Sequence, residues 1–186
     1  MEADYERIIQ RLRTAPPTCV SGFKLTPAEL PEPWDDNPRS VWQLACPCGS
    51  EHARLLGYAI SDYTDWPGGE NIFISPIGFE CAACGEVTEI LDTDIHGYNA
   101  EVGKLEPDGV GSVKYRGEGP RLAYPCPGCG GKLFAVTVGF VFWPGAIEVF
   151  LDEPGWRWED FFSAFVCYCR CVGCGQLCQP TDFGKL

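Results

Sequence analysis

Hydrophobic positions recur at helical spacing near the start of the chain and at strand spacing over most of the rest. Residues 2–13 place their apolar side chains on one face of a helix and charged side chains elsewhere. Two prolines, Pro16 and Pro17, end this predicted helix because the residue before a proline avoids helical geometry. The apolar face consists of Tyr5, Ile8, Ile9 and Leu12.

Prolines interrupt the pattern between residues 26 and 38, where they alternate with acidic residues. Such a composition is typical of an extended segment. Trp34 lies in its midst, and we expect this ring to pack on the protein surface. Residues 1–40 are therefore interpreted as a helix followed by a Pro-rich arm.

From residue 41 the pattern of elements occurs twice. Each copy has a short cysteine motif, an apolar-rich strand, a loop with turn residues and a returning strand that ends in a second motif. The first strands are predicted at 53–60 and 132–143. We interpret this as an internal duplication with copies at 41–95 and 121–186, joined by a Gly-rich connector at 96–120.

The four cysteine motifs are the main candidates for chemistry. Two closely spaced sulfurs on one turn supply two ligands to a tetrahedral divalent ion, so two motifs complete a site. A glycine follows the second cysteine of each motif, and glycine can adopt the positive φ that folds the backbone under the sulfurs. The predicted ligands are Cys46, Cys48, Cys81 and Cys84 in the first site and Cys126, Cys129, Cys171 and Cys174 in the second.

Disulfides would be the alternative use of these cysteines. The first residues lack a basic segment followed by an apolar stretch, so no secretory signal is visible. The longest apolar run, near 133–143, is about half of the roughly 20 residues that a membrane helix needs. We therefore expect a cytoplasmic protein with reduced thiols and no membrane association, in which paired cysteines bind metal.

The motifs resemble the knuckles of zinc ribbons, which have the rubredoxin-like form Cys-Pro-X-Cys-Gly. This resemblance covers about residues 41–92 and 121–182. It implies a mainly β fold of two tandem zinc ribbons, each a small antiparallel sheet with one metal between two knuckles. The first motif departs from the pattern because only one residue separates Cys46 from Cys48. That spacing could strain the knuckle or bring in His52 as a substitute ligand, although an all-cysteine quartet is expected.

Four cysteines lie outside the predicted quartets. At strand spacing Cys167 and Cys169 occupy the positions that Ile77 and Phe79 hold in the first copy. We expect both to be small buried hydrophobic residues rather than further ligands. Cys178 matches Thr88 of the first copy, and neither Cys178 nor Cys19 is expected to be catalytic.

The net charge of the chain limits the classes of macromolecule that it is expected to bind. The formal net charge is −12, and two zinc ions with four thiolates each would bring it to roughly −16. Nucleic-acid binding depends on clustered cations, so we expect no nucleic-acid partner. A basic protein partner is the class that this charge favours.

A second candidate for chemistry lies between the two copies. At strand spacing Asp92, Asp94 and His96 would share one face, where they could bind a metal or carry out acid–base catalysis. The simpler interpretation is a polar strand end with His96 hydrogen-bonded to a neighbouring carboxylate. No second catalytic cluster accompanies these residues.

The second copy is rich in aromatic residues, more than a small ribbon can bury internally. We therefore expect either that the two copies pack together or that one surface is adhesive. The stretch at 156–162 is interpreted as a lid over the core between the copies or as a docking site for a partner.

These observations predict a non-enzymatic zinc-binding module that interacts with another protein. One version is a bacterial immunity or antitoxin-type protein that masks a basic toxin. The alternatives are a hydrolytic enzyme that uses Asp92, Asp94 and His96, and rubredoxin-like electron transfer with iron in place of zinc.

Overall fold

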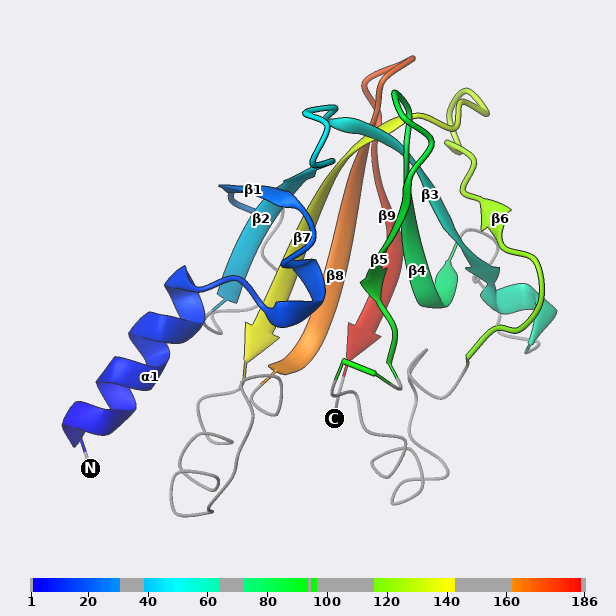
Figure 1. Cartoon of the computed structure of the whole chain (residues 1–186). Helices are drawn as coiled ribbons and strands as arrows, with labels where there is room; N and C mark the ends of the chain where they lie inside the picture. Colours follow the sequence, from blue (N-terminus) through cyan, green and yellow to red (C-terminus); the bar gives the residue numbers. More distant parts are fainter. Residues whose placement is uncertain are drawn as a thin grey trace.

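The computed structural model describes residues 2–30, 39–63, 72–93, 95–96, 116–142 and 162–184. It shows a mainly antiparallel β protein with one short N-terminal helix, which confirms the expected fold class (Figure 1). Helix α1 spans Glu2–Thr14, and two 3₁₀ turns, η1 and η2, span Thr18–Val20 and Ile60–Asp62. The strands are β1 (Lys24–Pro27), β2 (Arg39–Ala45), β3 (His52–Ala59), β4 (Phe73–Cys81), β5 (Val87–Leu91), β6 (Leu122–Ala123), β7 (Phe134–Phe142), β8 (Phe162–Cys171) and β9 (Leu177–Gly184).

Helix α1 forms where the helical periodicity predicts it. Ile8, Ile9 and Leu12 are buried in the main hydrophobic core, and Tyr5 packs against it. The helix ends at Thr14, two residues before the first of the two prolines. Its apolar face therefore anchors the N-terminal segment to the sheet.

Strands from both copies belong to one sheet. Strands β3, β4 and β5 form the first unit, and β7, β8 and β9 form the second. Strand β2 pairs along β7, and the start of β3 also pairs with the start of β7 through His52 and Ala53. One main core thus extends through both units, as expected for copies that pack together.

The two units have the same strand register. Ala53 lies opposite Cys81 in the first unit, and Phe134 lies opposite Cys171 in the second. On the next strand pair, Phe79 lies opposite Thr88 and Cys169 lies opposite Cys178. These equivalences are consistent with a tandem repeat, and they place Cys178 at the position of Thr88.

Aromatic rings pack both between the units and within the second unit. Phe73 packs edge-on against Tyr124, and Phe140 packs against Phe165, with ring centroids 5.2 Å apart in both pairs. The second copy's described rings are therefore largely internal. Trp34 and most of the stretch at 156–162 lie outside the described residues.

The last residues of the predicted connector are held on the first unit. Gly117 donates its backbone N–H to the carbonyl of Ser75, and Tyr58 donates its hydroxyl to the carbonyl of Gly119, both at 2.8 Å. Residues 97–115 of the connector lie outside the described part of the chain. Within that part, no helix has the length and hydrophobicity needed to cross a bilayer.

Candidate metal centres

All four cysteine motifs lie at one end of the sheet. Strands β2, β4 and β8 finish there, and β3, β5, β7 and β9 begin there, as their registers require. Figure 1 shows the four loops that carry the motifs gathered at the top of the sheet. The topology therefore brings together cysteines that are more than 30 residues apart in sequence.

Backbone hydrogen bonds give three of the four knuckles the same shape. The glycine four residues after the first cysteine donates its N–H to that cysteine's carbonyl at 2.8–3.0 Å. The first cysteine in turn donates its own N–H to the carbonyl of the residue after the glycine. Gly85, Gly130 and Gly175 adopt φ values of 71–75°, a region that glycine enters without steric cost, as the sequence predicts.

The first knuckle makes the same two hydrogen bonds with one residue fewer. Gly49 donates to the carbonyl of Cys46, and Cys46 donates to the carbonyl of Ser50, both at 2.8 Å. Its glycine absorbs the difference with a φ of 101°. The short spacing therefore changes the turn but still directs Cys46 and Cys48 into the quartet.

The eight predicted ligands form two quartets in which all sulfurs lie within 4.8 Å of one another. The Sγ–Sγ distances are 3.6 Å for Cys46–Cys84, 3.5 Å for Cys48–Cys81 and 3.6 Å for both Cys126–Cys174 and Cys129–Cys171. A tetrahedral ion with bonds of about 2.3 Å to sulfur needs sulfurs about 3.8 Å apart. A disulfide needs about 2.05 Å. The geometry therefore fits a four-coordinate metal rather than cross-linked thiols, and each quartet can bind such an ion.

The pKa values of the first quartet show why a bound cation would stabilise it. Backbone N–H groups, chiefly that of Cys84, lower the pKa of Cys81 from 9.0 to about 6. The N–H of Cys48 favours the thiolate of Cys46, but burial and the adjacent thiols outweigh it and raise that pKa to about 12. One sulfur thus ionises readily and its neighbour does not.

The second quartet shows the same conflict. Burial disfavours the thiolate of Cys126, yet the N–H groups of Gly128 and Cys129 outweigh burial and lower its pKa to about 6. The N–H of Gly131 favours the Cys129 thiolate, but neighbouring Cys174 and Cys171 raise its pKa to about 12. A divalent cation at the centre removes this conflict because it stabilises all four thiolates at once.

The remaining cysteines lie in or against the core. Cys167 and Cys169 are fully buried, which confirms their interpretation as small buried residues, and Cys178 is nearly buried as well. Burial raises the pKa of Cys178 to about 11, so its thiol stays neutral. Cys19 is half-buried and packs against the main core.

His52 does not join the first quartet. Its side chain is exposed at the start of β3, and the four sulfurs form the group without it. Its backbone carbonyl accepts a hydrogen bond from Ala82 at 2.9 Å, which ties the two knuckles of the site together. His52 therefore contributes to the site through its backbone carbonyl and not as a metal ligand.

The prediction that Asp92 and His96 share a strand face is wrong. Strand β5 ends at Leu91, and the chain turns so that the N–H of His96 reaches the carbonyl of Asp92. The imidazole Nδ1 accepts a hydrogen bond from the backbone N–H of Asp92 at 2.9 Å, and the Asp92 carboxylate pairs with Arg116. Asp94 lies outside the described residues, and the contacts of the other two tie the turn to the connector.

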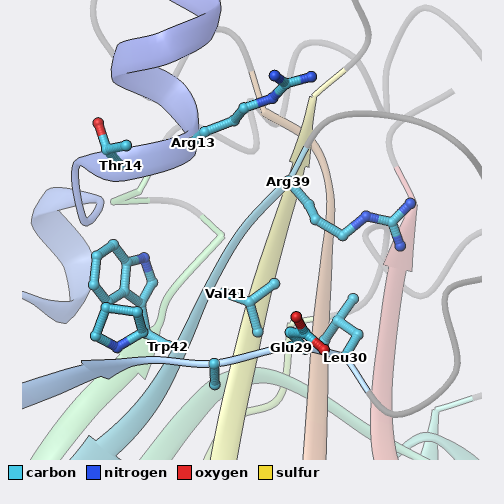
Figure 2. Close-up of a pocket in the computed structure, with 9 residues that line it drawn as sticks. Arg13, Thr14, Glu29, Leu30, Arg39, Val41 and Trp42 are labelled. Carbon is cyan, nitrogen blue, oxygen red and sulfur yellow. The ribbon is translucent and has the colours of Figure 1, made fainter.

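A separate cavity of about 440 Å³ opens between the end of α1, the segment after β1 and the first half of β2 (Figure 2). Leu30, Val41 and Trp42 form much of its apolar lining, and Arg13 and Arg39 add guanidinium groups. Ligand pockets of about 300–1,000 Å³ have this mixture of apolar surface and a few charges. Glu29 adds a carboxylate, so the lining combines apolar surface with charges of both signs. Sequence reasoning missed it because three segments without a common motif build it.

Comparison of the chain with protein-family models, with curated proteins and with solved structures finds no match. The quartets resemble the metal sites of zinc ribbons in ligand type and in knuckle shape. The function therefore has to be argued from the site itself.

Proposed function

We propose that this chain is a non-enzymatic protein-binding module in which two structural zinc ions fix one end of the sheet. The observation that carries the proposal is the closure of both sites: four sulfurs surround each centre. A four-coordinate ion held by four cysteines has no open position for water or substrate, which is the arrangement of structural rather than catalytic zinc.

The charged turn after β5 supports a binding role over catalysis. The carboxylate of Asp92 is nearly buried and pairs with Arg116 at 2.9 Å, while His96 accepts a main-chain hydrogen bond. Both groups are thus engaged in contacts that hold the first unit together. A general base would instead need an accessible lone pair directed at substrate.

The net charge of −12 favours a basic protein as the partner. Bacterial immunity and antitoxin-type proteins, which mask basic toxins, are one class that would fit. Zinc is the expected metal, and iron in the same quartets would give a rubredoxin-like electron-transfer protein instead.

The test uses the zinc-loaded full chain as bait in a lysate of its source organism. Captured proteins are identified by mass spectrometry, purified and titrated into the chain by calorimetry at two salt concentrations. We expect a basic partner whose affinity falls as salt rises. The Cys174→Ala variant serves as the unfolded-site control and should not bind.

Two results would contradict the proposal. One is recovery of no partner that binds directly in calorimetry. The other is hydrolase activity of the purified chain that His96→Ala abolishes while the metal content and melting temperature of the variant match those of the parent. A red sample with iron in place of zinc would instead favour electron transfer.

A further inference from the structure

The two units differ most in the charge that surrounds their metal sites. We define the first tip as residues 46–52 and 80–87, and the second tip as residues 126–133 and 170–177. The shared register makes the positions of the two tips equivalent, apart from the one residue that the first knuckle lacks. The chemistry at equivalent positions can therefore be compared directly.

Carboxylates of the first tip are replaced by cations or a neutral residue in the second. Glu80 lies opposite Arg54 and pairs with it at 2.6 Å, whereas the equivalent Arg170 lies opposite Ala135. The other exchanges are Lys132 for Glu51 and Gln176 for Glu86. The first tip thus has three carboxylates, with the guanidinium of Arg54 and the ammonium of Lys24 beside them, and the second has one ammonium and one guanidinium without a carboxylate.

The cations of the second tip are open to a partner. Lys132 and Arg170 are exposed, and neither forms an ion pair within the described residues. Arg170 donates only to the carbonyl of Gly175, at 3.2 Å, as far as the described residues show. In a chain with a net charge of −12, the side chains around this metal site include two cations and no carboxylate.

Exposed aliphatic side chains accompany these charges. Leu133 and Val172 are 41% and 48% exposed and adjacent, since the N–H of Val172 bonds to the carbonyl of Leu133. Their equivalents in the first tip are His52 and Ala82, but Val87 of that tip is 47% exposed. Apolar side chains ringed by charges are typical of the centre and rim of a protein interface.

Both tips lie side by side at one end of the sheet because the start of β3 pairs with the start of β7. We propose that two copies of the chain associate end to end through the tips about a two-fold axis. Such an axis, running between the tips, places Lys132 and Arg170 of each copy on the carboxylates of the other copy's first tip. Self-complementary patches of this kind are what a two-fold interface requires.

Size and electrostatics both agree with a second copy as the occupant. The two tips together supply about as many residues as the roughly 20–30 per side of a standard interface. The net charge of each copy opposes association, but charges more than about 8 Å apart are largely screened at physiological salt. Attractive charge pairs inside the interface are screened least. They therefore determine whether the two copies attract or repel each other. This inference does not depend on the protein partner proposed above.

The experiment is sedimentation equilibrium of the zinc-loaded full chain at physiological salt, with two charge-reversed variants. Lys132→Glu with Arg170→Glu replaces the two cations of the second tip by carboxylates. Glu51→Lys with Glu86→Lys replaces two carboxylates of the first tip by ammonium groups. We expect a dimer of twice 20.5 kDa for the parent and an affinity about 100-fold weaker or more for each variant alone. An equimolar mixture of the two variants should form a heterodimer.

The control variant is Asp62→Lys with Glu118→Lys, two exposed carboxylates away from the tips, and it should dimerise like the parent. Metal content and melting temperature report whether each variant is folded. If a charge-reversed variant loses metal, two neutral variants are used instead: Lys132→Gln with Arg170→Gln, and Glu51→Gln with Glu86→Gln. Each should dimerise about tenfold more weakly than the parent. A monomeric parent, or folded variants that fail to pair in the mixture, would overturn the proposal.

Discussion

Individual residues at the knuckles have distinct physical tasks. Cysteine supplies the ligand, and the glycine after the pair supplies a positive φ. Backbone N–H groups stabilise the negative sulfurs, as the lowered pKa values of Cys81 and Cys126 show. A substitution at a ligand removes a metal bond, whereas a substitution elsewhere in the knuckle changes only the turn that presents it.

Loss of one ligand should unfold the second unit. Cys129→Ala or Cys174→Ala leaves three sulfurs at a site whose ion contributes on the order of 10 kcal/mol to folding in comparable peptides. We expect the metal content to fall from two ions per chain to one and the melting temperature to drop sharply. Elemental analysis and circular dichroism provide the measurement.

Cys19→Ala is the matched control, because Cys19 lies in neither quartet. It should keep both metals. Variants of Cys129 and Cys174 that melt like the parent would show that the second site is not structural. Cys48→Ala in the first site should have a milder effect, because its knuckle is the short one.

Acidification should weaken metal binding. The thiolates of Cys81 and Cys126 have pKa values lowered from 9.0 to about 6. The stability that they contribute is complete above the ordinary value and is lost as the pH falls through about 6. Competition with a chelator should show an affinity that falls with decreasing pH by about tenfold or more per unit. An affinity that does not change with pH would contradict thiolate ligation.

Residue chemistry was predictable where it depends on local sequence. The eight cysteines, their quartets and the glycine geometry follow from motif spacing, and all of these residues come together in the structure. The arrangement of His96 did not follow, because the end of β5 at Leu91 depends on pairing with β4. Periodicity alone continues a strand through Asp92, and only the tertiary contact with Arg116 shows that the chain turns.

At the scale of elements, an ion pair with a nearly buried carboxylate links the connector to the first unit, in addition to the hydrogen bonds of Gly117 and Gly119. The side chain of Asp92 is 6% exposed, and Arg116 reaches it with two nitrogens at 2.9 and 3.3 Å. Arg54 and Glu80 form a comparable pair across β3 and β4; the two arginines are similarly exposed, at 41% for Arg116 and 48% for Arg54, whereas Glu80 is 22% exposed. Burial of the carboxylate therefore distinguishes two interactions that look alike in geometry.

Removal of the two arginines should have different costs. Arg116→Leu removes the guanidinium that pairs with the nearly buried Asp92 carboxylate and should lower the free energy of unfolding by about 1–3 kcal/mol. Arg54→Leu breaks an exposed pair and should cost no more than about 1 kcal/mol. Urea unfolding of both variants provides the comparison, and equal losses would mean that the buried pair does not hold the connector.

At the scale of the whole molecule, the two units share one sheet and one main core. Strand β7 pairs with β2 and β8 and, at its start, with β3, so no edge separates the copies. The sequence predicted the two units and their elements because the same pattern occurs twice. Packing of the two copies was one of the two alternatives that the aromatic content predicted. The strand pairing that joins them was not predicted, since it joins residues about 80 positions apart and leaves no local signal.

The direct measurement of the central claim is metal content followed by chelation. Elemental analysis should find two zinc ions per chain, and a strong chelator should abolish the β-sheet signal in circular dichroism, which returns when zinc is added back. A chain that contains no metal and keeps its sheet signal and melting temperature would contradict the account.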